Sequence, residues 1–176
     1  MTTLATLGDV SLRAYQDDHV AQTVLWLNQP ELRKDFGLSA TITEQSHRTW
    51  LAEQADLTVF AIYFKEIYVG NITLRINKNH KKAYYEMYLG DQSQQGKGIG
   101  KRSLQCLLEY AFVRLGLHRV YLHAFANSRA EQLYKSVGFM LEGTERDSVY
   151  LDDHFQDLNT LAILQGEWQS TGTVTI

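Results

Sequence analysis

The stretch DQSQQGKGIGKRS, residues 91–103, decides the fold, because it sets three glycines and three basic residues into one short loop. Before it stands AYYEMYLG (83–90), whose alternating residues predict a strand. After it, Leu104, Leu107 and Leu108 recur at helical spacing. Glycines let backbone amides approach an anion closely, and a helix N-terminus adds partial positive charge. The segment therefore predicts a strand, a phosphate-binding loop and a helix.

The spacing of these glycines excludes two common phosphate-binding loops. A Walker loop needs Ser or Thr after its final Gly-Lys, whereas Arg102 follows Gly100 and Lys101. A dinucleotide-binding loop needs a third glycine where Lys101 stands. It also needs an acid about twenty residues later, where His118 and Arg119 stand. The loop therefore belongs to another class of phosphate site.

The pattern that remains, Gln95-x-x-Gly98-x-Gly100, resembles the acetyl-CoA pyrophosphate loop of the GNAT superfamily of N-acetyltransferases. Upstream, YYEMYLG (84–90) is similar to the strand that precedes the loop in that family. Downstream, the family has a strand ending in asparagine and then a helix with a tyrosine before a Gly-Phe pair. This chain matches these places with Asn127, Ala130, Leu133, Tyr134, Gly138 and Phe139. The order of the other predicted elements extends the resemblance to nearly the whole chain.

Periodicity and turn residues predict the other elements: a strand at 10–15, helices at 17–29, 30–36 and 41–54, a hairpin over 57–77, a strand at 119–126, a helix at 128–137, and two strands around Asp152–Asp153. The resemblance implies an α/β (α+β) fold, the GNAT fold, with a mixed, mostly antiparallel twisted sheet of about seven strands and about four flanking helices. We expect a single domain over residues 1–168, and a tail over 169–176 that need not be ordered.

Composition predicts a cytoplasmic globular protein without a metal, a membrane anchor or a nucleic-acid partner. Hydrophobic residues make up 44% of the chain, the formal net charge is -3, and Cys106 is the only cysteine. The charge gives no reason to expect nucleic acid, and neither the single cysteine nor the six scattered histidines form a metal-ligand pattern. No apolar run approaches the ~20 residues of a membrane span, and the N-terminus lacks signal-peptide features.

The resemblance implies acetyl-CoA as the acetyl donor and assigns two groups of residues to it. The strand end would pair with the pantetheine arm through the backbone of Tyr88, Leu89 and Gly90, and Asn127 would bond to the same region. The loop would hold the pyrophosphate through Gln95, Gly96, Lys97, Gly98, Ile99, Gly100 and Lys101, and Arg102 would add charge.

The resemblance also implies direct attack by an amine on the donor, with both substrates bound. Tyr134 matches the family's general-acid tyrosine, although its spacing would equally suit a core tyrosine. Glu86 is the candidate general base, and the alternative is a carboxylate that only stabilises the sheet face. His123 is a second candidate base, and water is a third. Tyr84 and Tyr85 would join Tyr88 in lining the acceptor pocket, or serve only as strand formers.

The acceptor amine is less defined. The N-terminal helices resemble the branch that acts on nucleotide-linked amino sugars, where Arg33, Lys34 and Arg48 would suit a diphosphate. The C-terminal strands resemble that branch and the ribosomal-protein alanine acetyltransferases equally. We expect a small-molecule or peptide amine, with polyamines ranked third and a non-catalytic acyl-CoA-binding module left open. A homodimer is the common assembly in the family.

Overall fold

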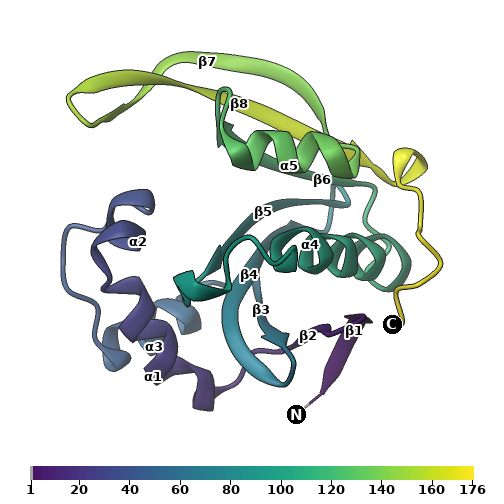
Figure 1. Ribbon diagram of the computed structural model, residues 1–176, viewed down its shortest axis with the longest axis horizontal. Helices are drawn as coiled ribbons and strands as arrows, with labels where there is room; N and C mark the ends of the chain where they lie inside the picture. The colour runs from purple at the N-terminus through teal and green to yellow at the C-terminus, as the bar shows by residue number, and fades with distance from the viewer. Residues whose placement is uncertain (1) are drawn as a thin grey trace.

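The computed structural model describes residues 2–176, and one mixed sheet of eight strands runs through them (Figure 1). The strands are β1 (Thr3–Leu7), β2 (Val10–Ala14), β3 (Leu57–Phe64), β4 (Ile67–Asn77), β5 (Lys82–Leu89), β6 (Arg119–Phe125), β7 (Met140–Leu151) and β8 (His154–Leu164). They lie in the order β1-β2-β3-β4-β5-β6-β8-β7. Among these strands, β5 and β6 are parallel and all other neighbours are antiparallel. The predicted fold class is confirmed, with one strand more than expected.

The sheet is flanked by the helices α1 (Val20–Leu27), α2 (Pro30–Asp35), α3 (Glu44–Glu53), α4 (Ile99–Glu109) and α5 (Arg129–Val137). In Figure 1, α4 and α5 lie close together, whereas α1 packs against α2 and α3 in a separate group. Pro30 stands in the first turn of α2, as predicted, and its fixed φ suits that position. Within residues 2–176, no helix is both long and apolar enough to cross a membrane.

The core lies between the sheet and α4. The apolar stripe predicted for this helix is buried at Leu104, Leu107, Leu108, Ala111 and Phe112. Leu115 was predicted on the same stripe but is 38% exposed. A π-helical turn over Tyr110–Arg114 precedes it and changes the helical spacing, so Leu115 no longer lies in line with the stripe. Cys106 is fully buried beside the stripe, and burial raises the pKa of its thiol to about 12. The predicted packing role of this cysteine agrees with these surroundings.

Two strands extend beyond the sequence prediction. The prediction omitted β1, which turns into β2 at Gly8, a residue with a φ of 58°. β7 begins at Met140, although only its end near Ser148 was predicted, because most of its side chains are exposed and no apolar alternation marks it. The predicted tail, residues 169–176, returns to β1, where Thr6 and Thr175 exchange backbone hydrogen bonds of 2.8 and 3.0 Å.

Gly90, directly after β5, is a point of close approach between the sheet and α1. A Cβ atom at this position would lie 1.9 Å from Cδ2 of Trp26, whose ring is 5% exposed. The backbone N–H of Gly90 also donates to the Val69 carbonyl over 2.9 Å, which fixes the strand end against β4. Only glycine fits here without moving the indole ring, so this residue sets how α1 sits on the sheet.

The Gly90→Ala variant should therefore be destabilised by about 1–3 kcal/mol, the usual cost of overpacking a filled site. Gly143→Ala is the matched control, because nothing lies within 4 Å of a Cβ atom there. We expect the control to stay within about 0.5 kcal/mol of wild type. Urea unfolding of the three proteins measures both effects, and equal stability of the two variants would contradict the packing constraint at Gly90.

A buried carboxylate organises the turn from β6 to α5. Asn127 adopts a left-handed φ of 61°, and its backbone N–H donates to Glu131 Oε2 over 2.5 Å. Glu131 is 2% exposed and also accepts from Asn159 Nδ2 at 3.0 Å and Lys135 Nζ at 2.7 Å. Ser128 caps α5 by accepting from the Glu131 backbone N–H. The predicted Ser-x-x-Glu cap is present, and its glutamate reaches back to Asn127.

Glu131→Gln should lower the free energy of unfolding by about 1–3 kcal/mol at pH 7, because it removes the charge from a buried hydrogen-bonded group. The Lys135 ammonium holds the pKa of the Glu131 carboxyl below its ordinary value of 4.5. A lowered native pKa stabilises the fold above that ordinary value and loses its effect as the pH falls below it. The difference in the free energy of unfolding between wild type and Glu131→Gln should therefore become smaller below pH 4.5.

Glu142→Gln is the control for this prediction, since Glu142 pairs with Arg119 on the surface and exposed pairs contribute about 0–1 kcal/mol. Urea unfolding at several pH values provides the comparison. A Glu131→Gln effect no larger than that of the control would show that the carboxylate does not organise this turn.

Candidate active site

A gap opens in the sheet between β5 and β6. Their parallel pairing runs only from Lys82 opposite Arg119 to Tyr84 opposite Tyr121. Beyond this point β5 stays paired with β4, and β6 stays paired with β8. The carboxyl ends of the two strands therefore separate, and the loop into α4 and the turn into α5 follow directly from them (Figure 1).

The backbone of β5 presents unpaired groups to this gap. In an antiparallel pair, the N–H and C=O of one residue point to the same side. Because the Gly90 N–H bonds to β4, the backbone of Tyr88 also points to β4, and that of Met87 and Leu89 points into the gap. Of the three residues predicted here, Leu89 offers its backbone to the gap, and Met87, which was not predicted, joins it. Asn127 stands across the gap, two residues after β6.

The glycine loop ends at the start of α4, beside the gap. Gly96 and Gly98 have φ values of 78° and 70°, which favour glycine, and Gly98 is the residue before the helix. The first helical turn leaves backbone N–H groups without intrahelical acceptors, and these are the amides of Ile99, Gly100 and Lys101. The Ile99 side chain is buried in the core, so this residue offers only its backbone. The predicted loop therefore has the geometry of an anion site.

The basic residues of the loop differ in what they contact. Arg102 turns back and donates to the carbonyls of Lys97 at 3.0 Å and Gly98 at 3.3 Å, and its guanidinium lies over the Phe64 ring. Arg102 therefore braces the loop, which differs from the predicted role of adding charge for a phosphate. Lys97 Nζ donates to the Gln94 side chain over 2.8 Å at the surface. Gln95, just before the glycines, closes a turn through its N–H.

Tyr134 lies on the α4 side of the sheet. Its ring meets the buried Tyr85 edge-on, with centroids 6.0 Å apart, and lies 5.8 Å from the Phe139 ring. Burial, followed by the nearby Glu86 carboxylate, raises the pKa of Tyr134 to about 12. The phenol therefore keeps its proton at neutral pH and can act as a donor. The Tyr85 hydroxyl is buried and has no partner among the protein atoms of residues 2–176.

A pocket of about 360 Å³ lies on the opposite face of β3, β4 and β5. Its floor contains the cross-strand pairs Asn71–Tyr88 and Thr73–Glu86. Its walls come from α1, α3, the segment between α2 and α3, and Tyr15 just after β2. They are mostly apolar or aromatic: Tyr15, Leu27, Phe36, Leu38, Ile42 and Trp50. Of the described residues that line it, Glu86 is the only acid.

Both candidate bases lie on this face of the sheet. Burial raises the pKa of Glu86, and the charges of Arg75 and His123 together with the Thr73 hydroxyl partly oppose this effect. Glu86 nevertheless remains accessible to solvent. The Tyr84 ring lies between the strands, with its centroid 5.3 Å from that of His123. Alternation along β5 thus puts Glu86 in the pocket, whereas Tyr134 on α5 lies on the other face, and the Glu86 carboxylate still contributes to the raised pKa of Tyr134.

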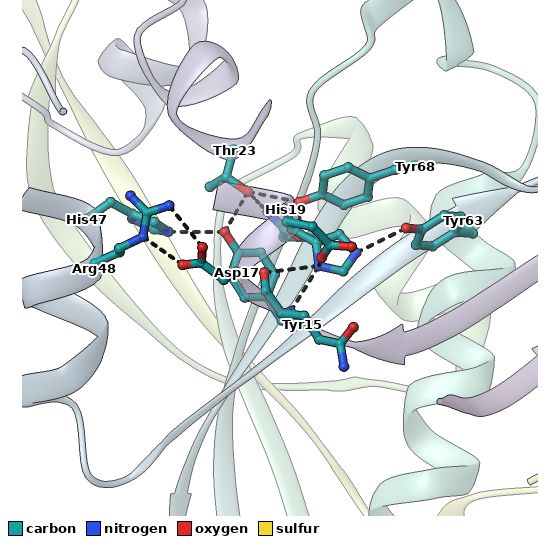
Figure 2. A network of polar contacts seen from close by, with 11 residues as sticks. Tyr15, Asp17, His19, Thr23, His47, Arg48, Tyr63 and Tyr68 are labelled. Carbon is teal, nitrogen blue, oxygen red and sulfur yellow. Dashed lines mark hydrogen bonds and ion pairs between the residues drawn. The ribbon is translucent and has the colours of Figure 1, made fainter. Parts of the chain in front are cut away.

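A polar network joins α1 and α3 to the sheet, and Figure 2 shows its members Tyr15, Thr23, His47 and Tyr68. We define the Thr23 network as Tyr15, Thr23, His47, Tyr68, Asn71 and Tyr88, which are joined by hydrogen bonds of 2.7–3.3 Å. His19 lies beside it and is held by the Gln16 backbone and the Tyr63 hydroxyl. The sequence analysis did not identify this network, because its members come from five separate elements and no local motif marks them.

The three cations predicted to suit a diphosphate are already engaged. Arg33 donates to Asn28 and to the backbone carbonyls of residues 39 and 40. Lys34 pairs with Asp152 at the tip of the β7–β8 hairpin, and Arg48 pairs with Asp17 and Glu44. Arg75, the arginine of the pocket, bonds to Gln54 and Asp56. These side chains therefore stabilise the helices and strands around the pocket. The cations predicted to bind a diphosphate already have partners within the chain.

Comparison with known proteins identifies the family. Residues 21–139 match the model of the acetyltransferase (GNAT) family. The chain is 32% identical over 96 residues to the spermidine N(1)-acetyltransferase of Vibrio cholerae, a match that covers 54% of this chain and 55% of that protein. It is 26% identical over 171 residues to the ribosomal-protein-serine acetyltransferase of Escherichia coli strain K12, covering 91% and 95%. The match to the spermidine enzyme thus spans only about half of that relative's length.

The fold is likewise similar to that of a solved relative. The crystal structure of spermidine N-acetyltransferase from Vibrio cholerae in complex with CoA and spermine superposes with a TM-score of 0.82 at 22% identity, covering 91% of this chain and 98% of that one. The predicted resemblance to amino-sugar enzymes finds no support in these relatives. The loop, the gap, Tyr134 and the match over residues 21–139 agree, and the chain belongs to the acetyltransferase (GNAT) family.

Proposed function

We propose that this protein transfers the acetyl group of acetyl-CoA to a primary amine. The observation that carries the proposal is the meeting of three features at the β5–β6 gap. These are an anion-binding loop, a tyrosine that keeps its proton, and a pocket with one carboxylate on the other face of the sheet. A transferase with two substrates needs a site for each and a passage between them, and the gap supplies that passage.

The residues present fit acetyl-CoA, which supplies the acetyl group as an activated thioester. The free amides of Ile99, Gly100 and Lys101 would hold the pyrophosphate, together with the left-handed turns at Gly96 and Gly98. The backbones of Met87 and Leu89 would pair with the pantetheine arm as an added strand does. The lone hydroxyl of Tyr85 is a further polar group that needs a partner.

The chemistry divides between the two faces of the sheet. An alkylammonium has a pKa of about 10.4, so it must lose a proton before its nitrogen attacks the thioester carbon. Glu86 would accept that proton directly or through water, with His123 as the alternative. A carbon–nitrogen bond forms, the carbon–sulfur bond breaks, and Tyr134 would give its proton to the departing thiolate. The proton that the attacking nitrogen loses as the amide forms would return to Tyr134 or pass to water. The protonated state of Tyr134 suits this donor role.

A polyamine is the acceptor that we favour. The match of this chain to a spermidine acetyltransferase, which covers 55% of that enzyme, supports this choice. The aromatic side chains Phe36, Trp50 and Tyr88 that line the pocket suit an alkyl chain with an ammonium group, and Glu86 gives the pocket a negative charge. The engaged cations around the pocket argue against a nucleotide diphosphate, so the amino-sugar acceptor is no longer preferred.

A protein N-terminal amine is the second candidate. Its support is the match to a ribosomal-protein-serine acetyltransferase, which covers 91% of this chain. Measuring the release of free CoA thiol with spermidine, N-terminal serine and alanine peptides, and amino-sugar nucleotides would separate these acceptors. Turnover on one class identifies the substrate. Tight CoA binding with no turnover on any amine would favour a non-catalytic binding module and contradict the proposal.

The Tyr134→Phe variant should lose about 10²–10⁴-fold in turnover, because it lacks the proton that the leaving thiolate needs. Its affinity for CoA, measured by calorimetry, should stay close to that of wild type. Tyr110→Phe is the matched control, since Tyr110 directly follows the C-terminal end of α4, away from the glycine loop, with its ring against Phe60. Equal turnover of wild type and Tyr134→Phe would exclude the general-acid role.

Glu86 should determine the acid limb of the pH profile. A base must be ionised to accept a proton, and burial raises the pKa of Glu86 above its ordinary value of 4.5. The kcat/KM of wild type should therefore fall as the pH is lowered through that raised pKa. Glu86→Gln should lose about 10²-fold in kcat/KM and also lose this limb. If His123→Gln shows these effects and Glu86→Gln does not, then His123 is the base.

A further inference from the structure

Each hydrogen bond of the Thr23 network has only one possible donor, and the donors can be assigned starting from Asn71. The Asn71 amide donates both hydrogens, to Thr23 Oγ1 at 3.0 Å and to Tyr88 Oη at 2.8 Å. The Tyr68 hydroxyl donates to Asn71 Oδ1 at 2.7 Å. Since Tyr68 has given its only hydrogen, the 2.8 Å contact between Tyr68 and Thr23 is a donation from Thr23.

The assignment then passes through Thr23 to His47. Thr23 Oγ1 has two lone pairs, and the Asn71 amide and the Tyr15 hydroxyl fill them. Tyr15 has thereby given away its hydrogen, so its oxygen is an acceptor toward His47 Nε2, 3.3 Å away. The hydrogen of the neutral His47 ring therefore sits on Nε2, and Nδ1 carries a lone pair.

The lone pair of His47 Nδ1 has no protein partner in the described part of the chain, although the residue is only 7% exposed. No hydrogen bond joins Nδ1 to the described residues. The completely buried polar atoms without a partner in residues 2–176 are Gln29 Oε1, Tyr85 Oη and Ser103 Oγ, so a small part of Nδ1 is exposed. His47 lines the acceptor pocket, and its ring stacks on Trp50 with centroids 5.8 Å apart. Burial lowers the pKa of His47, which favours the neutral ring.

We infer that His47 Nδ1 accepts a hydrogen bond from an N–H group of the acceptor substrate, and that Tyr15 is a positioning residue that fixes the tautomer required for it. The inference rests on the proposed function. It adds a nitrogen acceptor on α3, His47, to the Glu86 carboxylate on the pocket floor. A diamine or polyamine has a second nitrogen to match the second acceptor, whereas a monoamine has none. His47 thus selects for an acceptor with more than one amino group.

The tautomer can be tested without any enzyme assay. In wild type, the ¹⁵N chemical shifts of the His47 ring should report a protonated Nε2 and an unprotonated Nδ1. Tyr15→Phe removes the acceptor for Nε2–H and should shift the population toward the other tautomer. Titration with spermidine in the presence of CoA should move the Nδ1 signal of wild type. A protonated Nδ1, or an Nδ1 signal that spermidine leaves unchanged, would overturn the inference.

Kinetics test the selectivity. His47→Gln keeps a polar group near Nε2 but removes the acceptor at Nδ1, so the KM for spermidine should rise about tenfold or more. Its kcat should stay within about threefold, and its KM for butylamine within about twofold. His47→Asn, which keeps an oxygen near the Nδ1 position, should recover part of the loss. His80→Gln, on the exposed turn after β4, is the matched control.

The outcomes separate this inference from the proposed function. A structural role for His47 would raise the KM for spermidine and butylamine equally, and that result would overturn the inference while leaving the acetyltransferase intact. If wild type turns over no amine, the proposed function fails. The spermidine-induced change at Nδ1 then still decides whether the pocket binds amines through His47.

Discussion

Strands β5 and β6 pair in parallel over three residue pairs and then separate, and the rest of the site depends on this divergence. It is held from both sides, because β4 keeps β5 and β8 keeps β6 in antiparallel register to their ends. The backbone groups of Met87 and Leu89 are consequently left without a strand partner, and unpaired backbone groups require water or a ligand. The loop into α4 and the turn into α5 start from these two strand ends, so the fold delivers the anion site and Tyr134 to the same opening.

Strand alternation then assigns the two sides of the opening to different tasks. On β5, Tyr85 faces the core and the ring of Tyr134, whereas Glu86 faces the pocket. The register with β4 sets Thr73 and Asn71 opposite Glu86 and Tyr88, so the pocket floor is a row of polar groups. A shift of one residue in this register would exchange the two faces, burying Glu86 and exposing Tyr85. The register of the central strands is thus a condition for function as well as for stability.

How far the sequence predicts this protein depends on how local each feature is. The loop, α4 and the Ser128 cap were predicted because their partners lie within a few residues, whereas β7 was shortened because its side chains are mostly exposed and lack apolar alternation. The partner of Lys34, Asp152, stands 118 residues away, so a sequence window could not show that this cation is paired. Arg48 has one local partner, Glu44, but its other partner, Asp17, is 31 residues away. His47 was overlooked for the same reason, since Tyr15 is 32 residues distant.

The same distinction explains why the family was easier to predict than the acceptor. The loop and strand end proposed for the donor lie within residues 87–101, and a contiguous segment leaves a motif. The pocket draws on Tyr15, Thr23, His47, Asn71 and Tyr88, and its hydrogen-bonding direction is fixed only when all of them meet. Replacing the Tyr15 hydroxyl is expected to change which nitrogen of His47 carries the hydrogen. The acceptor preference proposed for this chain therefore depends on residues that no contiguous motif marks.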